Sequence, residues 1–116
     1  PPALAAGTLE ALRIIGAEPE RRTQLVENAR YLRSRLRDIG VAPAGISDGY
    51  IVPIVLGASK RTSEVGRALC DAGFLVGAVR PPTVPMGQSR LRITVSAAHR
   101  PCHIDGLVDA MATVLQ

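Results

Sequence analysis

A proline-rich segment over residues 80–89 constrains this chain more than any other feature. It reads R-P-P-T-V-P-M-G-Q-S, so three prolines and a glycine fall close together. Proline lacks a backbone N–H and fixes its own φ angle, which excludes both a helix interior and a central strand. The segment is therefore predicted to be a partly stiff loop.

A strand with one apolar and one polar face is predicted directly after this loop. Over residues 91–96 apolar and polar side chains alternate, and Arg90 and Arg92 belong to the polar set. Successive side chains of a strand point to opposite faces, so one face should join the core. An arginine on the other face is suited to bind a carboxylate through two parallel hydrogen bonds. The alternative is that both arginines only solvate the outer face of the sheet.

Four segments are predicted to be helices. Three of them have apolar residues at steps of three and four, as one face of a helix does: residues 2–15, 25–39 and 101–115. A shorter helix is predicted to follow an N-cap at Thr62 or Ser63 and to end at Gly73. Pro101 fits the first turn of the last helix.

Two further apolar runs, residues 51–56 and 74–79, are predicted strands. Pro53 cannot donate to a strand ladder, so the first of them should lie at an edge or a bulge. The resulting order fits an α+β fold, a small mostly antiparallel sheet with helices packed on one face. A chain of 116 residues suits a single domain, residues 1–116.

Composition excludes several classes of protein. Apolar residues make up 47% of the chain without a run of about 18, which argues against disorder and against a spanning helix. Cys70 and Cys102 lie far apart, so neither a disulfide framework nor a zinc site is supported, and a reducing cytoplasmic setting is expected. Cys70 is predicted to be a small core residue beside Leu69.

The net charge of +4 comes almost entirely from arginine, since Lys60 is the only lysine. Arg30, Arg33 and Arg37 share one stripe of the second helix. Such a stripe could bind nucleic acid, but a solvated arginine face is the favoured interpretation, with Glu27 paired to Arg30.

His99 and His103 are four residues apart, a spacing that could place two metal ligands on one helix face. Pro101 between them indicates that the helix only begins there, and no third ligand stands at a suitable spacing. A solvent or capping role is therefore favoured, and no metal site is predicted. Arg100 is a poor N-cap, so a slightly frayed helix start is expected.

The chain shows no phosphate-binding loop, dinucleotide fingerprint, nucleophile elbow or carboxylate pair at a working spacing. No catalytic residue and no cofactor-binding residue is therefore predicted within it. The informative segment is residues 77–99, G-A-V-R-P-P-T-V-P-M-G-Q-S-R-L-R-I-T-V-S-A-A-H.

These residues closely resemble the C-terminal signature of the α-oxoamine synthases. Those are pyridoxal 5′-phosphate (PLP) enzymes that join an amino acid to an acyl thioester with loss of CO2. The Arg-Pro-Pro-Thr-Val-Pro version resembles the branch in biotin biosynthesis that uses L-alanine and a pimeloyl thioester, carried on coenzyme A or on acyl carrier protein. The opening helix and the strand at Ile51 also match the family.

The resemblance implies the small C-terminal domain of a fold-type I PLP enzyme. It implies that Arg92 binds the carboxylate of the amino-acid substrate, that Thr83 contacts the acyl substrate, and that Arg80 shapes the same entrance. It further implies a cytoplasmic homodimer whose partners are small-molecule substrates, with no nucleic acid and no membrane.

One departure from the family limits this expectation. The family's Schiff-base lysine lies in its large domain, whereas Lys60 falls between a predicted strand and helix and is not expected to be catalytic. The chain opens Pro-Pro-Ala without Met. We therefore expect a C-terminal fragment, inactive alone and without bound PLP, whose catalytic lysine and cofactor-binding residues precede Pro1.

Two alternatives stay open at this point. Sibling branches of the family use glycine or serine and share the Arg-Leu-Arg strand, although they resemble residues 80–82 less well. A ferredoxin-like ligand-binding or RNA-binding module would also fit the order of elements from residue 51. That module would need a further strand and aromatic stacking residues, and the chain has only Tyr31, Tyr50 and Phe74.

Overall fold

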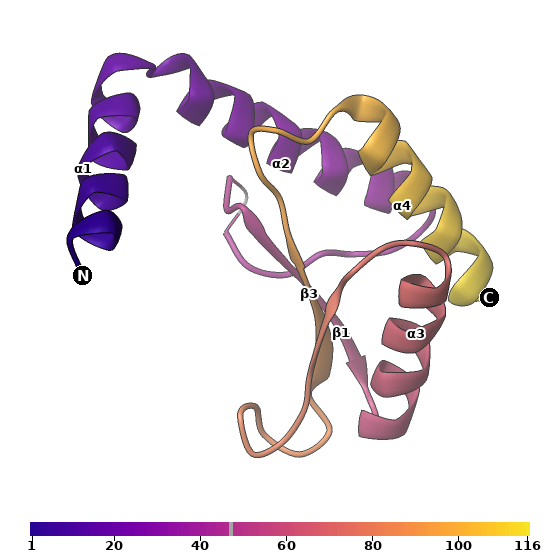
Figure 1. Cartoon of the computed structure of the whole chain (residues 1–116). Coiled ribbons are helices and arrows are strands. Elements are labelled where there is room, and N and C mark those ends of the chain that lie inside the picture. The colour runs from indigo at the N-terminus through magenta and orange to yellow at the C-terminus, as the bar shows by residue number, and fades with distance from the viewer. Residues whose placement is uncertain (47) are drawn as a thin grey trace.

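Four helices and three strands follow one another in the predicted order (Figure 1). A computed structural model describes residues 1–46 and 48–116. The elements are α1 (Pro2–Ala17), α2 (Glu20–Asp38), β1 (Ile51–Gly57), α3 (Ser59–Asp71), β2 (Gly77–Val79), β3 (Ser89–Thr94) and α4 (Pro101–Val114).

The three strands form one antiparallel sheet in the order β1-β3-β2. Pro53 therefore lies on an edge strand, as its missing N–H predicts. β3 is the central strand, and its Arg92 is paired with Pro53 on one side and with Gly77 on the other. The predicted α+β class with an antiparallel sheet is confirmed.

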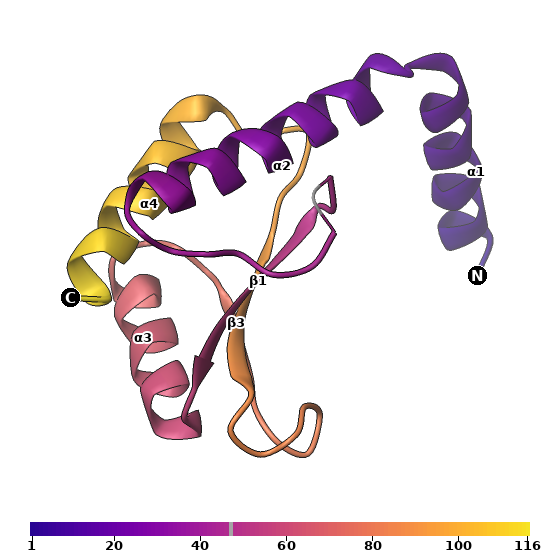
Figure 2. The same ribbon diagram turned by 180° about the vertical axis from the view of Figure 1, so that it is seen from behind.

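Helices α2, α3 and α4 pack together on one face of the sheet and leave the other face open (Figures 1 and 2). The apolar residues Leu91 and Ile93 of β3, and Val95 directly after the strand, point toward these helices, since all three are buried. The predicted apolar face of this strand is therefore confirmed. The largest fully buried apolar side chains are Leu32, Leu36, Val52, Leu69, Leu91, Val108 and Met111.

Helix α1 forms as predicted, but its apolar residues do not join this core. The helix extends away from the sheet at the N-terminal end of α2 (Figures 1 and 2) and contains no buried residue. Leu4 and Leu12 keep 68% and 61% of their surface exposed. None of the helices that the structure describes is both long and apolar enough to cross a membrane.

Helix α3 begins earlier than the sequence suggested. Ala58 is the N-cap, and Thr62 lies one turn inside the helix, where its hydroxyl donates to the Ala58 carbonyl at 2.9 Å. A threonine can bond in this way to the carbonyl four residues earlier, so its presence does not mark a helix start. The predicted N-cap at Thr62 or Ser63 is therefore wrong.

The strand predicted over residues 74–79 is shorter than expected, because its first residues belong to the turn that ends α3. Gly73 has a φ of +94°, and the N–H of Phe74 donates to the Leu69 carbonyl at 2.8 Å. These features are those of a helix C-terminal motif with a glycine in the left-handed region. Only residues 77–79 of the predicted 74–79 pair with β3.

Arg33 corrects the prediction of a fully solvated arginine stripe. Only 2% of this residue is exposed, and its guanidinium donates to the carbonyls of Ala44 and Ile51 at 2.8 and 3.2 Å. Burial lowers the pKa of Arg33, and the nearby positive charge of Arg37 lowers it further. The arginine ties the segment after α2 to the start of β1.

Two smaller predictions also fail. Cys70 is exposed rather than a core residue, because the helix turns its Leu69 side toward the sheet. Arg30 pairs with Asp48, at 2.8 Å between Nε and Oδ1, instead of with Glu27. The hydrogen bond from Arg30 lowers the pKa of Asp48 below its ordinary value.

Candidate functional site

The three residues singled out in the sequence lie around one hollow. Arg80 and Thr83 come from the loop after β2, and Arg92 comes from the centre of β3. The hollow has a volume of about 540 Å³ and is also lined by Ser59, Gly77, Ala78, Val79, Pro81 and Met86. The proline-rich loop therefore folds back beside the polar face of the strand that follows it.

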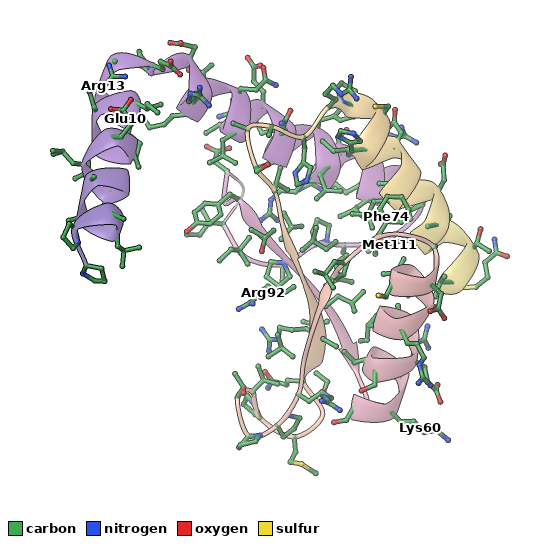
Figure 3. The ribbon with its side chains drawn as sticks, in the orientation of Figure 1. Glu10, Arg13, Lys60, Phe74, Arg92 and Met111 are labelled. Carbon is green, nitrogen blue, oxygen red and sulfur yellow. The ribbon has the colours of Figure 1, made fainter. Side chains whose placement is uncertain are left out.

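Arg92 is exposed on the open face of the sheet, as the alternation predicted. Its side chain extends from β3 away from α3 and α4 (Figure 3). Among the residues that the structure describes, none accepts a hydrogen bond from its guanidinium or forms an ion pair with it. The group is thus held at its base by a sheet and is free at its tip, which suits the binding of an anion.

Arg80 and Thr83 are held together by the turn that opens the loop. The N–H of Thr83 donates to the Arg80 carbonyl at 3.2 Å, and the Thr83 side chain stays exposed. The Arg80 guanidinium donates to the hydroxyl of Ser63 on α3 at 3.2 Å. Thr83 therefore presents its polar group on the loop side of the hollow, whereas the guanidinium of Arg80 is directed to α3.

Ser59 is a lining residue that sequence reasoning missed. It opens α3, and its hydroxyl lies 3.1 Å from that of Ser89, which is fully buried at the start of β3. This contact ties the beginning of the central strand to the beginning of α3. No local pattern distinguishes Ser59 from other serines, because its position depends on where α3 starts and which strand it meets.

Lys60 lies outside the hollow. Its side chain is 90% exposed, and Nζ is 4.0 Å from Oε1 of Glu64 on the outer surface of α3 (Figure 3). A lysine that bonds covalently to PLP needs a pocket around it that also holds the ring and the phosphate. Lys60 has no such surroundings, so the described residues do not fit PLP.

The two histidines accept hydrogen bonds from the backbone. Nδ1 of His99 accepts from the N–H of Ser96, and Nδ1 of His103 accepts from the N–H of Arg100, each at 3.0 Å. His103 therefore caps the start of α4, as the capping alternative predicted, and supplies the cap that Arg100 cannot. Among residues 1–46 and 48–116, no group of three His, Cys, Asp or Glu side chains is arranged to hold a metal ion.

Comparison with known protein families settles the relationship of the chain. The family model for aminotransferase class I and II matches residues 1–111. The chain belongs to the aminotransferase class I and II family. The match begins before α1 and ends within α4, so it includes all three strands and the hollow beside the proline-rich loop.

Curated relatives within this aminotransferase family carry a common name. The chain is 47% identical over 114 residues to the 8-amino-7-oxononanoate synthase of Methylococcus capsulatus. This alignment covers 97% of the chain but only 29% of that relative. The chain thus spans about three tenths of the length of the curated protein that it matches.

Solved structures in the family have the same fold. A low-resolution structure of SPT superposes with a TM-score of 0.90 at 29% identity, covering 98% of this chain and 31% of that one. A variant of serine palmitoyltransferase from S. paucimobilis, with a bound PLP–myriocin aldimine, gives a TM-score of 0.82 at 28% identity, covering 90% and 27%. The sequence-based resemblance to fold-type I PLP enzymes is confirmed.

Proposed function

We propose that this chain is the C-terminal domain, residues 1–116, of a PLP-dependent 8-amino-7-oxononanoate synthase. The complete enzyme would join L-alanine to a pimeloyl thioester, with loss of CO2, in biotin biosynthesis. The observation that carries this proposal is the free guanidinium of Arg92 beside the proline-rich loop. The name shared by relatives at 41–47% identity supports the choice of substrates.

In this proposal the residues around the hollow bind substrates and do not carry out the chemistry. The guanidinium of Arg92 binds the carboxylate of L-alanine through two parallel hydrogen bonds, which fixes the orientation of the amino acid. Thr83 contacts the acyl thioester from the loop, and Arg80 shapes the entrance through which it arrives. The prolines that flank Thr83 limit its freedom and lower the entropic cost of binding.

We propose that the complete enzyme holds PLP and its lysine in a further part of the protein, since the described residues do not fit the cofactor. When bound, PLP stabilises negative charge on the α carbon of the amino acid. We therefore expect the chain alone to bind no PLP and to be inactive. The complete enzyme is proposed to be a cytoplasmic homodimer without nucleic-acid or membrane partners.

Substitution of Arg92 in the complete enzyme tests this function. A charge-assisted hydrogen bond contributes about 1.5–3 kcal/mol, so Arg92→Ala should raise KM for L-alanine by roughly 10- to 100-fold. KM for the pimeloyl thioester should change little. Arg90→Ala is the matched control, because Arg90 bonds to Gln88 and does not line the hollow. An unchanged KM for L-alanine in the Arg92→Ala enzyme would refute the proposal.

A sibling activity is the second candidate, because the superposition with SPT reaches a TM-score of 0.90. Comparing L-alanine, glycine and L-serine as substrates of the complete enzyme separates the two. A clear preference for glycine or serine would replace the L-alanine assignment and leave the role of Arg92 intact.

A further inference from the structure

We propose that Gly77 is a positioning residue for Arg92. Because glycine has no side chain, the space beside β2 stays open, and the Arg92 side chain can extend through it to the hollow. This inference rests on the proposed function, in which Arg92 binds the carboxylate of the amino acid. It concerns a residue of β2 that has no polar group of its own and is not part of the loop.

Three residues form a row across the open face of the sheet. Arg92 is paired directly with Pro53 of β1 and with Gly77 of β2. Directly paired residues in antiparallel strands have their side chains on the same face, so all three share the open face. Arg92 therefore has a rigid proline ring on one side and no side chain on the other.

The side of Arg92 that has no neighbouring side chain is the side on which the hollow lies. Gly77, Ala78 and Val79 line the hollow, whereas no residue of β1 does. A β carbon built on Gly77 would lie 3.7 Å from both Cβ and Nε of Arg92. The stem of the arginine thus passes next to the glycine on its way to the loop, and atoms beyond a β carbon at position 77 would compete for the same space.

The backbone does not explain why position 77 is glycine. Five glycines in the described structure have a positive φ, a conformation that favours glycine, and Gly77 is not among them. Glycine in a strand also lacks the packing and the restricted backbone that stabilise other strand residues. Side chains other than hydrogen would suit the strand, and the close approach of the Arg92 stem is the feature of this position that disfavours side chains larger than alanine.

The complete PLP-loaded enzyme tests the inference through a graded set of substitutions. Gly77→Ala should leave KM for L-alanine within about twofold, because a β carbon at 3.5–3.7 Å makes ordinary van der Waals contacts. Gly77→Val should raise KM for L-alanine by about tenfold or more, since small misplacements of a binding group have effects of that order. The kcat of the reaction should stay within about twofold of the parent enzyme, and so should KM for the acyl thioester.

Folding is controlled separately. Valine favours strands, so Gly77→Val should keep the thermal midpoint of the parent enzyme, and Gly77→Thr offers a second branched side chain should the valine variant fold poorly. Thr94→Val is the matched control. It replaces the hydroxyl of an already branched side chain by a methyl group on the same face of the sheet, next to Ile51 and away from the hollow, and should not change KM.

A double variant, Gly77→Val with Arg92→Ala, shows whether the rise in KM for L-alanine depends on Arg92. In an Arg92→Ala enzyme, Gly77→Val should cause no further rise in KM for L-alanine. A further rise of similar size, or an unchanged KM in both Gly77→Val and Gly77→Thr, would overturn the positioning role. If Arg92→Ala itself leaves KM unchanged, the proposed function fails as well, and the two failures are thereby distinguished.

Discussion

Replacing Arg33 by methionine should destabilise the fold far more than the same change at Arg37 on the same helix. Arg33 is 2% exposed and bridges α2 to the carbonyls of Ala44 and Ile51 at 2.8 and 3.2 Å, whereas Arg37 is exposed. Methionine keeps an unbranched apolar stem but donates no hydrogen bond. The variant therefore removes these two bonds, and a longer one of 3.5 Å to the Gly49 carbonyl, without removing most of the packing.

The size of the effect follows from those bonds. Each hydrogen bond from a charged group contributes about 1.5–3 kcal/mol, which gives roughly 3–6 kcal/mol for the two shorter bonds. Burial of the guanidinium opposes this, as the lowered pKa of Arg33 indicates, and Nε has no partner among the described residues. We expect a net loss of about 3 kcal/mol in the free energy of unfolding, a change of about 100-fold in the folding equilibrium.

Urea unfolding followed by circular dichroism measures this loss, and Arg37→Met should stay within about 0.5 kcal/mol of the parent. Hydrogen exchange gives a local test. The N–H of Ala44 donates to the Pro53 carbonyl at 2.9 Å, so its exchange should accelerate in Arg33→Met and not in Arg37→Met. Equal stability of the two variants, with equal exchange at Ala44, would show that the buried arginine does not hold this segment.

Two further outcomes are expected. The hydrogen bond from Arg30 lowers the pKa of Asp48, so any stability from this pair is present above the unfolded-state pKa and is lost as pH falls through the lower folded-state value. Arg30→Ala should raise the Asp48 titration midpoint toward its ordinary value, and an unchanged midpoint by NMR would contradict the pairing. A β carbon on Gly106 would lie 3.1 Å from Cζ of Phe74, so Gly106→Val should cost about 1–3 kcal/mol. Thermal unfolding measures this cost, and an undiminished midpoint would show that the Phe74 ring moves aside freely.

Local patterns predicted the elements of the fold well where the physical rule is itself local. The alternation over residues 91–96 determines which side chains of β3 face the helices, because neighbouring side chains of a strand must point in opposite directions. The prolines of residues 80–89 likewise restrict the backbone whatever surrounds them. Pro53 marked its strand as an edge for the same kind of reason.

Patterns were less informative where a distant segment decides the outcome. The spacing of Arg30, Arg33 and Arg37 shows that they share a helix face, but not that the chain after the helix returns to cover only Arg33. The apolar side of α1 similarly suggests burial, although no described residue packs over it. Burial is a property of the assembled molecule, so a periodic stripe cannot by itself show what lies against it.

The candidate site divides in the same way. The sequence by itself determined the stiff loop, the polar face of the strand and the resemblance that singled out Arg80, Thr83 and Arg92. Only the tertiary structure decided that these side chains surround one hollow with Ser59, and that Gly77 gives Arg92 its path. The physical reason is that strand pairing brings together residues far apart in the chain, and their register depends on the packing of the whole sheet.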